Sequence, residues 1–143
     1  MKVFLDTNIL LDRMLRRELN IDIVDELFSL ICNERIIGFT TTNALTDIFY
    51  IASKFLGKDA TKYELLDIID IVSIISVDCD DCMIALNLPI TDFEDAIAVV
   101  CASKADVEYI ITNDNDFPKG KFGQCKVVKP EEFLKVYNRS VSQ

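Results

Sequence analysis

The sequence contains no histidine, and it has only four glycines and three prolines among 143 residues. Without histidine the chain cannot use an imidazole for acid–base catalysis, for activating a serine or cysteine nucleophile, or as a metal ligand. So little glycine and proline is not the composition of a disordered chain. The sequence also shows no internal repeat. The chemistry of this protein must therefore rest on other side chains.

Long hydrophobic runs are also missing. The longest apolar run, residues 96–102, is far shorter than the ~18 residues that a membrane-spanning helix needs. The first apolar run is interrupted at Asp6 and is too short for the core of a signal peptide. We therefore expect a cytoplasmic protein with no membrane association.

Acidic residues outnumber basic ones, which gives a formal net charge of −9 and an isoelectric point near 4.4. This balance argues against a general nucleic-acid binder, whose affinity comes from lysine and arginine on phosphates. It is compatible with an enzyme that binds divalent cations through its carboxylates, because the ions invert the local charge.

The five cysteines form an odd set, which favours reduced thiols over a disulfide framework. Cys79 and Cys82 make one CxxC pair. With no second pair and no histidine, that spacing cannot complete a four-ligand zinc site. The aspartates between the two cysteines would raise a thiol pKa, so we interpret the pair as thiols flanking a helix.

Four short apolar runs rich in β-branched residues predict buried strands, and a fifth run is weaker. The expected strands are 2–6, 36–40, 74–78, 108–112 and, as the weaker one, 124–128. The segments between them have apolar residues at helical spacing, and the expected helices cover 23–31, 44–56, about 59–69, 82–88 and 92–104. This alternation predicts one domain, 1–143, with a three-layer α/β/α fold and a central parallel sheet of four to five strands.

Acidic side chains follow several of these strands. Asp6 ends the first, Asp47 lies on the helix after the second, and Asp114 and Asp116 follow the fourth. Asp95 opens a helix that is apolar on most sides, so its carboxylate needs a partner. Each has an ordinary structural alternative: Asp6 could cap a helix, Asp47 could face solvent, and Asp114 and Asp116 could form a turn.

Taken together, the acidic residues favour a metal site. The carboxyl ends of parallel strands share one edge of the sheet, so these carboxylates are expected to converge there. Converging carboxylates repel one another unless cations lie between them. Mg²⁺ and Mn²⁺ prefer hard oxygen ligands, and one or two such ions would resolve the repulsion.

Four motifs in this order resemble a PIN domain, the nuclease fold of the VapC-type toxins. The resemblance extends from Lys2 to about Phe133, and its motifs are VFLDTNILLD, TTNALTDIFY, DFEDAIAVVCA and IITNDNDF. It implies a metal-dependent endoribonuclease that hydrolyses RNA phosphodiester bonds through an activated water and leaves a 5′-phosphate and a 3′-hydroxyl.

The resemblance also implies the roles of individual residues. Asp6 matches the first acid of the family, Asp95 the third, and Asp114 the fourth, with Asp116 beside it as a further ligand. Asp47 stands where the family usually has glutamate, which is one methylene longer, so the number of ions stays open at one or two.

Two polar residues match positions that orient the acids by hydrogen bonds in the family, namely Asn8 and Thr112. VapC-type toxins usually pair with a small antitoxin protein and form homodimers, and the resemblance implies both for this chain. Basic residues near the motifs could flank the site and contact RNA, could contact an antitoxin, or could form a solvated face: Arg13, Arg16, Arg17, Lys119 and Lys121.

Other families with an aspartate after the first strand fit less well. A haloacid-dehalogenase-type phosphatase needs a second acid where this chain has Asn8, and a receiver domain needs an acid next to Asp6. A P-loop motif is absent from the sequence. The alternative that stays open is a non-catalytic PIN-like module that binds RNA or acts as a scaffold.

Overall fold

The structure is a computed structural model that describes residues 1–17 and 21–143. Its strands are β1 (Lys2–Leu5), β2 (Ile37–Thr41), β3 (Ser73–Ile75), β4 (Tyr109–Ile111), β5 (Lys121–Phe122) and β6 (Cys125–Val128). Its helices are α1 (Thr7–Leu15), α2 (Ile21–Cys32), α3 (Thr42–Leu56), α4 (Lys58–Ile71), α5 (Cys79–Leu86), α6 (Phe93–Lys104) and α7 (Pro130–Val141).

The strands form one sheet in the order β3-β2-β1-β4-β6-β5, and all of the pairs except β5 with β6 are parallel. The prediction of four to five strands therefore missed one. β5 has two residues and joins β6 through a tight turn, where Gly123 has a φ of 60° that suits glycine. β1 lies between β2 and β4, so the strand order reverses at its end.

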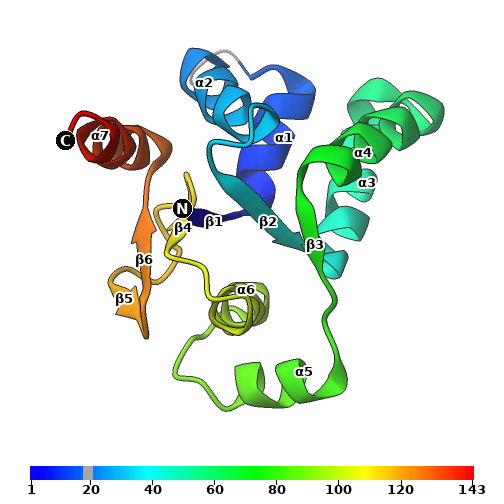
Figure 1. The fold of residues 1–143 in the computed structure, drawn as a ribbon. Helices are drawn as coiled ribbons and strands as arrows, with labels where there is room; N and C mark the ends of the chain where they lie inside the picture. Colours follow the sequence, from blue (N-terminus) through cyan, green and yellow to red (C-terminus); the bar gives the residue numbers. More distant parts are fainter. Residues whose placement is uncertain (18–20) are drawn as a thin grey trace.

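Helices cover both faces of the sheet, which confirms the predicted three-layer fold class (Figure 1). One buried cluster combines α1, α2, α3 and α7 with one face of the sheet. The second cluster packs α5 and α6 against the other face. The buried strands are rich in valine, isoleucine and phenylalanine because each of their faces meets a helix layer.

Helix starts are marked by side-chain caps where the sequence offers them. The carboxylate of Asp6 accepts from Thr7 N at the start of α1, and the hydroxyl of Thr41 accepts from Ala44 N at the start of α3. Gly57 lies between α3 and α4 at the end of α3, and its positive φ of 80° is a backbone angle that favours glycine.

The third expected strand was too long. β3 ends at Ile75, and Asp78 caps α5 in a capping box with Asp81 instead of ending a strand. Lys104 reaches both carboxylates, with its ammonium 2.6 Å from Asp81 and 3.8 Å from Asp78. Asp78 is therefore part of a network of polar side chains that joins α5 to α6. The helix α5 starts at Cys79, three residues before the predicted start at residue 82.

All five cysteines are free thiols, which agrees with the expectation of reduced cysteines. Cys79 and Cys82 lie in the first two turns of α5 and not beside a helix, so the expectation that they flank one was wrong. Over the described residues, no helix has both the length and the apolar character that crossing a membrane would require.

The C-terminal helix α7 was not among the predicted elements, although it completes the first buried cluster. Phe133 is fully buried there, and its ring lies 5.5 Å from that of Tyr109 in an edge-on arrangement. We predict that Phe133→Ala lowers the free energy of unfolding by about 3–5 kcal/mol, because it leaves a cavity in the core. Val141→Ala, at an exposed position of the same helix, should change it by less than ~0.5 kcal/mol.

Chemical denaturation of the two variants and the wild type measures both values. A loss below about 1 kcal/mol for Phe133→Ala would mean that α7 contributes little to the core.

Candidate active site at the end of strand β1

Asp6 occupies the junction between β1 and α1, at the point where the strand order reverses. One carboxylate oxygen accepts from Thr7 N at 2.8 Å. The other accepts from the Thr112 hydroxyl at 2.7 Å and from the Asn8 amide at 3.0 Å. Asp6 is therefore a helix cap, with Thr7 as its partner, and at the same time a neighbour of the other acidic side chains.

Asn8 and Thr112 join the ends of β1 and β4, as the resemblance implied for orienting residues. The amide of Asn8 also approaches the Thr112 hydroxyl at 3.3 Å, and its oxygen accepts from Asn113 N at 3.1 Å. The Thr112 hydroxyl in turn accepts from Asp114 N at 3.0 Å. These bonds fix the direction in which the loop after β4 leaves the sheet.

The loop after β4 is also held by Asp12, a buried residue of α1 that the sequence analysis did not select. Its carboxylate accepts from the Asn113 amide at 3.0 Å and from Arg17 at 3.3 Å. Asp12 lies one helical turn beyond Asn8, on the same face of α1, and this i, i+4 spacing was the available signal. Asp114 then accepts from Asp116 N at 2.8 Å, which folds the two aspartates into one turn.

The first turn of α6 brings Asp95 toward Asp6. Asp92 caps this helix as predicted, since its carboxylate accepts from Asp95 N at 3.1 Å. Burial first, and then repulsion from Asp92, Asp6, Asp114 and Asp116, raises the pKa of Asp95 to about 7. A carboxylate with this pKa lies among other negative charges without a cation to offset them.

Asp47 of α3 meets Glu94 of α6, a residue that the sequence analysis did not select. A hydrogen bond between the two side chains is the main reason why the pKa of Glu94 rises to about 7, followed by burial and by repulsion from Asp47, Asp92 and Asp6. Glu94 is adjacent to Asp95 in the DFEDA motif, and that adjacency was the only signal in the sequence. Asp47 is one methylene shorter than the glutamate that the resemblance leads one to expect at its position, and Glu94 brings a glutamate side chain next to it.

A small cavity of about 20 Å³ lies between these residues, with Asp6, Thr41, Asn43, Asp47 and Glu94 in its wall. That volume holds about one water molecule or one small ion. The side-chain oxygen of Asn43 is buried and has no hydrogen-bond partner among the residues that the structure describes. Burial raises the pKa of Asp6 against the lowering effect of its hydrogen bonds, and repulsion from Asp114 adds to the rise.

The donor set fits a hard divalent cation. Its members are carboxylate oxygens with raised pKa values and one unpartnered amide oxygen, which are the ligands that Mg²⁺ and Mn²⁺ prefer. Within residues 1–17 and 21–143, no three acidic or cysteine side chains come close enough to hold a metal ion by themselves. Water ligands would therefore have to complete the shell, as Mg²⁺ commonly requires.

The basic residues divide between two regions. Arg13 and Arg16 lie at the far end of α1 from Asp6 and both bind Asp25 of α2, at 2.9 and 2.6 Å. The expectation that they flank the acidic site is therefore wrong, because α1 carries them away from it. Arg17 is tied to Asp12.

Lysines approach the site from its other side. Lys119 shares a cavity of about 330 Å³ with Asp114 and Thr112, and Lys129, which was not selected from the sequence, lies in the same wall. Lys121 is exposed on β5, outside that wall. Of the two lysines named from the sequence in this region, Lys119 lies beside the acidic side chains and Lys121 does not.

The comparisons with known proteins agree with this geometry. The family model of the PIN domain matches residues 2–116. The chain belongs to the PIN domain family. No curated protein matches the sequence. The first three motifs and most of the fourth lie inside the matched part of this PIN domain, and the match leaves out α7.

Solved structures similar to this PIN domain come from bacterial toxins. The Mycobacterium tuberculosis toxin VapC20, described as cleaving the sarcin–ricin loop, is 15% identical with a TM-score of 0.66, and the alignment covers 80% of this chain and 92% of that one. Rickettsia felis VapBC2 bound to a promoter DNA fragment is 17% identical with a TM-score of 0.67, covering 90% and 98%. DNA-bound VapBC from Salmonella typhimurium is 16% identical with a TM-score of 0.64, covering 91% and 98%. At these identities the likeness supports the fold.

We predict that the metal-free PIN domain loses thermal stability as the pH rises from about 5 to about 8. In the folded state Glu94 and Asp95 have pKa values of about 7, whereas ordinary values are 4.5 and 3.8. Between these values the folded state holds protons that the unfolded chain has released, so raising the pH favours unfolding. The chain has no histidine, which keeps this pH window free of imidazole titration.

Thermal melts in EDTA measure the loss, and melts with Mn²⁺ at each pH should show it reduced. Asp95→Asn should flatten the EDTA profile, raise the melting temperature near neutral pH and weaken Mn²⁺ binding. An EDTA profile that is level or rises with pH would contradict the acidic repulsion described above.

Proposed function

We propose that this PIN domain is a metal-dependent endoribonuclease that hydrolyses RNA phosphodiester bonds and acts in the cytoplasm as the toxin of a toxin–antitoxin pair. The observation that carries the proposal is the gathering of Asp6, Asp95 and Asp114 near the end of β1, where burial and mutual repulsion raise the pKa values of Asp6 and Asp95. Membership of the PIN domain family and the fold shared with VapC toxins support it.

The residues would divide between two positions for a cation, Mg²⁺ or Mn²⁺. Asp6, Asp95 and Asp114, with Asp116, form the first, and Asp47 with Glu94 forms the second. A divalent cation held there would supply the chemistry that makes a water molecule acidic enough to act as the nucleophile at neutral pH. This chemistry needs no histidine and yields a 5′-phosphate and a 3′-hydroxyl.

The chain's own side chains supply orientation and binding. Asn8 and Thr112 hold the carboxylate of Asp6 from two directions, so that it cannot rotate away from the site. Lys119 and Lys129, beside Asp114, would bind phosphates of the RNA next to the bond that is cut. The positive charge on that side offsets the overall negative charge of the protein where the RNA enters.

The alternative is a non-catalytic module that binds RNA or serves as a scaffold. A scaffold would have no need for carboxylates with mutually raised pKa values, because that repulsion destabilises the folded chain. The number of acids retained at one point therefore favours the enzyme.

We predict that Asp6→Asn lowers RNA cleavage by about 100-fold or more while the protein stays folded, because the site loses its central charge. A mixed, 5′-labelled RNA pool incubated with Mg²⁺, Mn²⁺ or EDTA measures the cleavage. Asp70→Asn, at an exposed position of α4, is the matched control and should cut like the wild type. Cleavage by Asp6→Asn at the wild-type rate, or cleavage by the wild type in EDTA, would contradict the mechanism.

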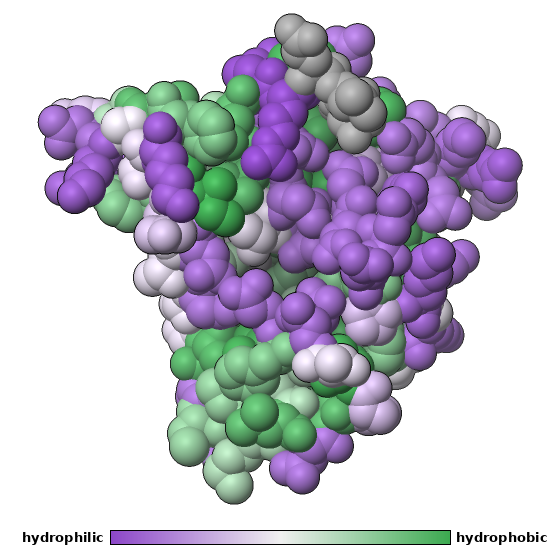
Figure 2. All heavy atoms as spheres, turned by 180° about the vertical axis from the view of Figure 1, so that it is seen from behind, coloured by the Kyte–Doolittle hydropathy of each residue, from purple (hydrophilic) through white to green (hydrophobic). Residues whose placement is uncertain are grey.

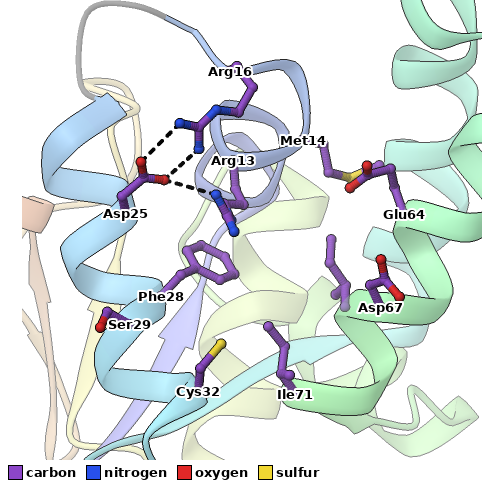
Figure 3. A pocket seen from close by; sticks show the side chains of 11 residues that line it. Arg13, Met14, Arg16, Asp25, Phe28, Ser29, Cys32, Glu64, Asp67 and Ile71 are labelled. Carbon is purple, nitrogen blue, oxygen red and sulfur yellow. Dashed lines mark hydrogen bonds and ion pairs between the residues drawn. The ribbon is translucent and has the colours of Figure 1, made fainter.

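A groove on the other side of α1 suits the antitoxin. It lies between α1, α2 and α4, has a volume of about 570 Å³, and is lined by Phe28, Ile71 and other side chains (Figure 3). Figure 3 shows Arg13 and Arg16 turned toward Asp25 along one rim and acidic residues of α4 on the opposite rim. Apolar side chains between charged rims fit an amphipathic helix, which is how many short regulatory segments bind. Two of the similar structures are of VapBC proteins bound to DNA, and the pairing of VapC-type toxins with an antitoxin, which the family resemblance implies, supports a partner of this kind.

We also propose that the chain forms a homodimer. Hydrophobic side chains gather on the lower part of the molecule in Figure 2, at the height where Figure 1 places α5. Met83, Ile84 and Leu86 of α5 are all exposed. An apolar surface of this kind is typical of a protein interface, and sedimentation analysis measures whether two copies associate.

We predict that Ile71→Glu weakens antitoxin binding by at least about tenfold, because it places a charge in the floor of the groove. Ile71 is 38% exposed, so the variant should fold. Ile69→Glu, on the same helix, 46% exposed and outside the groove lining, is the matched control. Any small protein found to be encoded beside this gene serves as the probe, co-expressed with each variant and recovered with it. Equal recovery with both variants would place the partner elsewhere, and no recovery with the wild type would contradict the antitoxin.

A further inference from the structure

An open cavity of about 530 Å³ lies directly beside the acidic site, between α3, α5 and α6. It shares Asn43, Asp47 and Glu94 with the small acidic cavity, so the two spaces have a common wall. Its volume falls within the range of about 300–1,000 Å³ that small-molecule sites occupy. Any group bound in this cavity would therefore lie next to the carboxylates.

The other side of the cavity is apolar. Phe93, Val77 and Ile97 contribute to its lining, and Thr46 lies at its polar border. Phe93 is 42% exposed although it is one of the larger apolar side chains of the chain. Phe93 therefore presents part of its ring to the cavity, where a ligand with a flat apolar face could stack on it.

Phe93 and Asp95 belong to the same first turn of α6. Phe93 lines the open cavity, and Asp95, two residues further along the helix, lies close enough to Asp6 and Asp114 for their charges to repel it. The rest of α6 is buried against the sheet, which makes it a rigid support. One helix end therefore fixes the distance between an aromatic platform and the proposed cation site.

A nucleobase matches these features. It has a flat apolar face for Phe93, polar edges for Asn43 and Thr46, and a covalent link to the phosphate that a cation at Asp6 and Asp95 would bind. A free acidic peptide or a lipid would meet the carboxylates of Asp47 and Glu94 without such a link. A base can enter the cavity only when it is unstacked from its neighbours.

We propose that this cavity binds an unpaired, extruded nucleobase next to the phosphodiester bond that is cut, stacked on Phe93. The inference rests on the proposed ribonuclease function and adds a base-binding subsite to it, lined by Phe93, Asn43 and Thr46. Phe93 is then a specificity-determining residue that touches the substrate.

The experiment uses the full chain and a single-stranded RNA tetranucleotide that contains 2-aminopurine, whose fluorescence falls on stacking. Stopped-flow mixing with protein and Mg²⁺ records the change before cleavage. Stacking on an aromatic side chain is worth a factor of about 5 to 150 in affinity. We expect Phe93→Ala to weaken binding by that factor and to lose the quenching, and Phe93→Tyr to keep both.

Two further variants separate stacking from folding and from general aromatic exposure. Phe93→Leu keeps the apolar bulk without the aromatic face, so it should fold like the wild type and still lose the quenching. Phe55→Ala removes an exposed aromatic residue of α3 outside this cavity lining and should behave like the wild type. Mapping of cuts in a structured RNA should place them at unpaired nucleotides in the wild type.

Each other outcome overturns the proposal in a recognisable way. Wild-type binding and cutting by Phe93→Ala would remove the base from this cavity while leaving the nuclease intact. Cuts confined to paired regions would do the same. A change in sedimentation of Phe93→Ala without a change in RNA binding would show a second copy of the chain on this surface. A wild type that neither binds nor cuts RNA in any metal would end the proposed function, and this inference with it.

Discussion

The carboxylate of Asp6 accepts hydrogen bonds from three residues, and this arrangement ties together the parts of the molecule that matter for its chemistry. Thr7 belongs to the helix that follows Asp6, Asn8 to the next position of that helix, and Thr112 to the end of the neighbouring strand. A parallel sheet brings the ends of β1 and β4 together, and these bonds convert that proximity into a fixed geometry. Together with the bonds from Asn113 to Asn8 and Asp12, they hold the loop that carries Asp114 at the end of the sheet.

The same arrangement has a cost for stability. Three carboxyl groups, those of Asp6, Glu94 and Asp95, have raised pKa values because burial and neighbouring charges disfavour their ionised forms. Fold stability alone does not select such a cluster, since neutral residues of similar size would avoid the repulsion. The cluster is consistent with a site where folding stability is lower in exchange for cation binding. Packing elsewhere, such as that of the buried Phe133 of α7, contributes stability to the fold.

Sequence patterns predicted the fold class for clear physical reasons, because buried strands appear as short β-branched runs. An aspartate such as Asp6 at the end of a strand is unusual enough to be selected as a candidate, and Asp95 was selected because a charge opens an apolar helix. Glu94 was not, because its role depends on Asp47 of another helix, and nothing in either local pattern records that contact. The only local signal for Asp12 was its i, i+4 spacing from Asn8. The positions of Lys129 and Arg13 relative to the acidic side chains follow from tertiary packing, which local spacing does not reveal.

The two outer strands of the sheet are short. β3 and β5 have three and two residues, whereas β2 in the interior has five. An outer strand presents unpaired backbone groups that can recruit the edge of another molecule's sheet, and a long one is an aggregation hazard. Half of the residues of this chain are hydrophobic, so a continuous edge would be dangerous at high concentration. The short outer strands leave few backbone groups for such pairing, so the edges of this sheet offer little template for a strand from another chain.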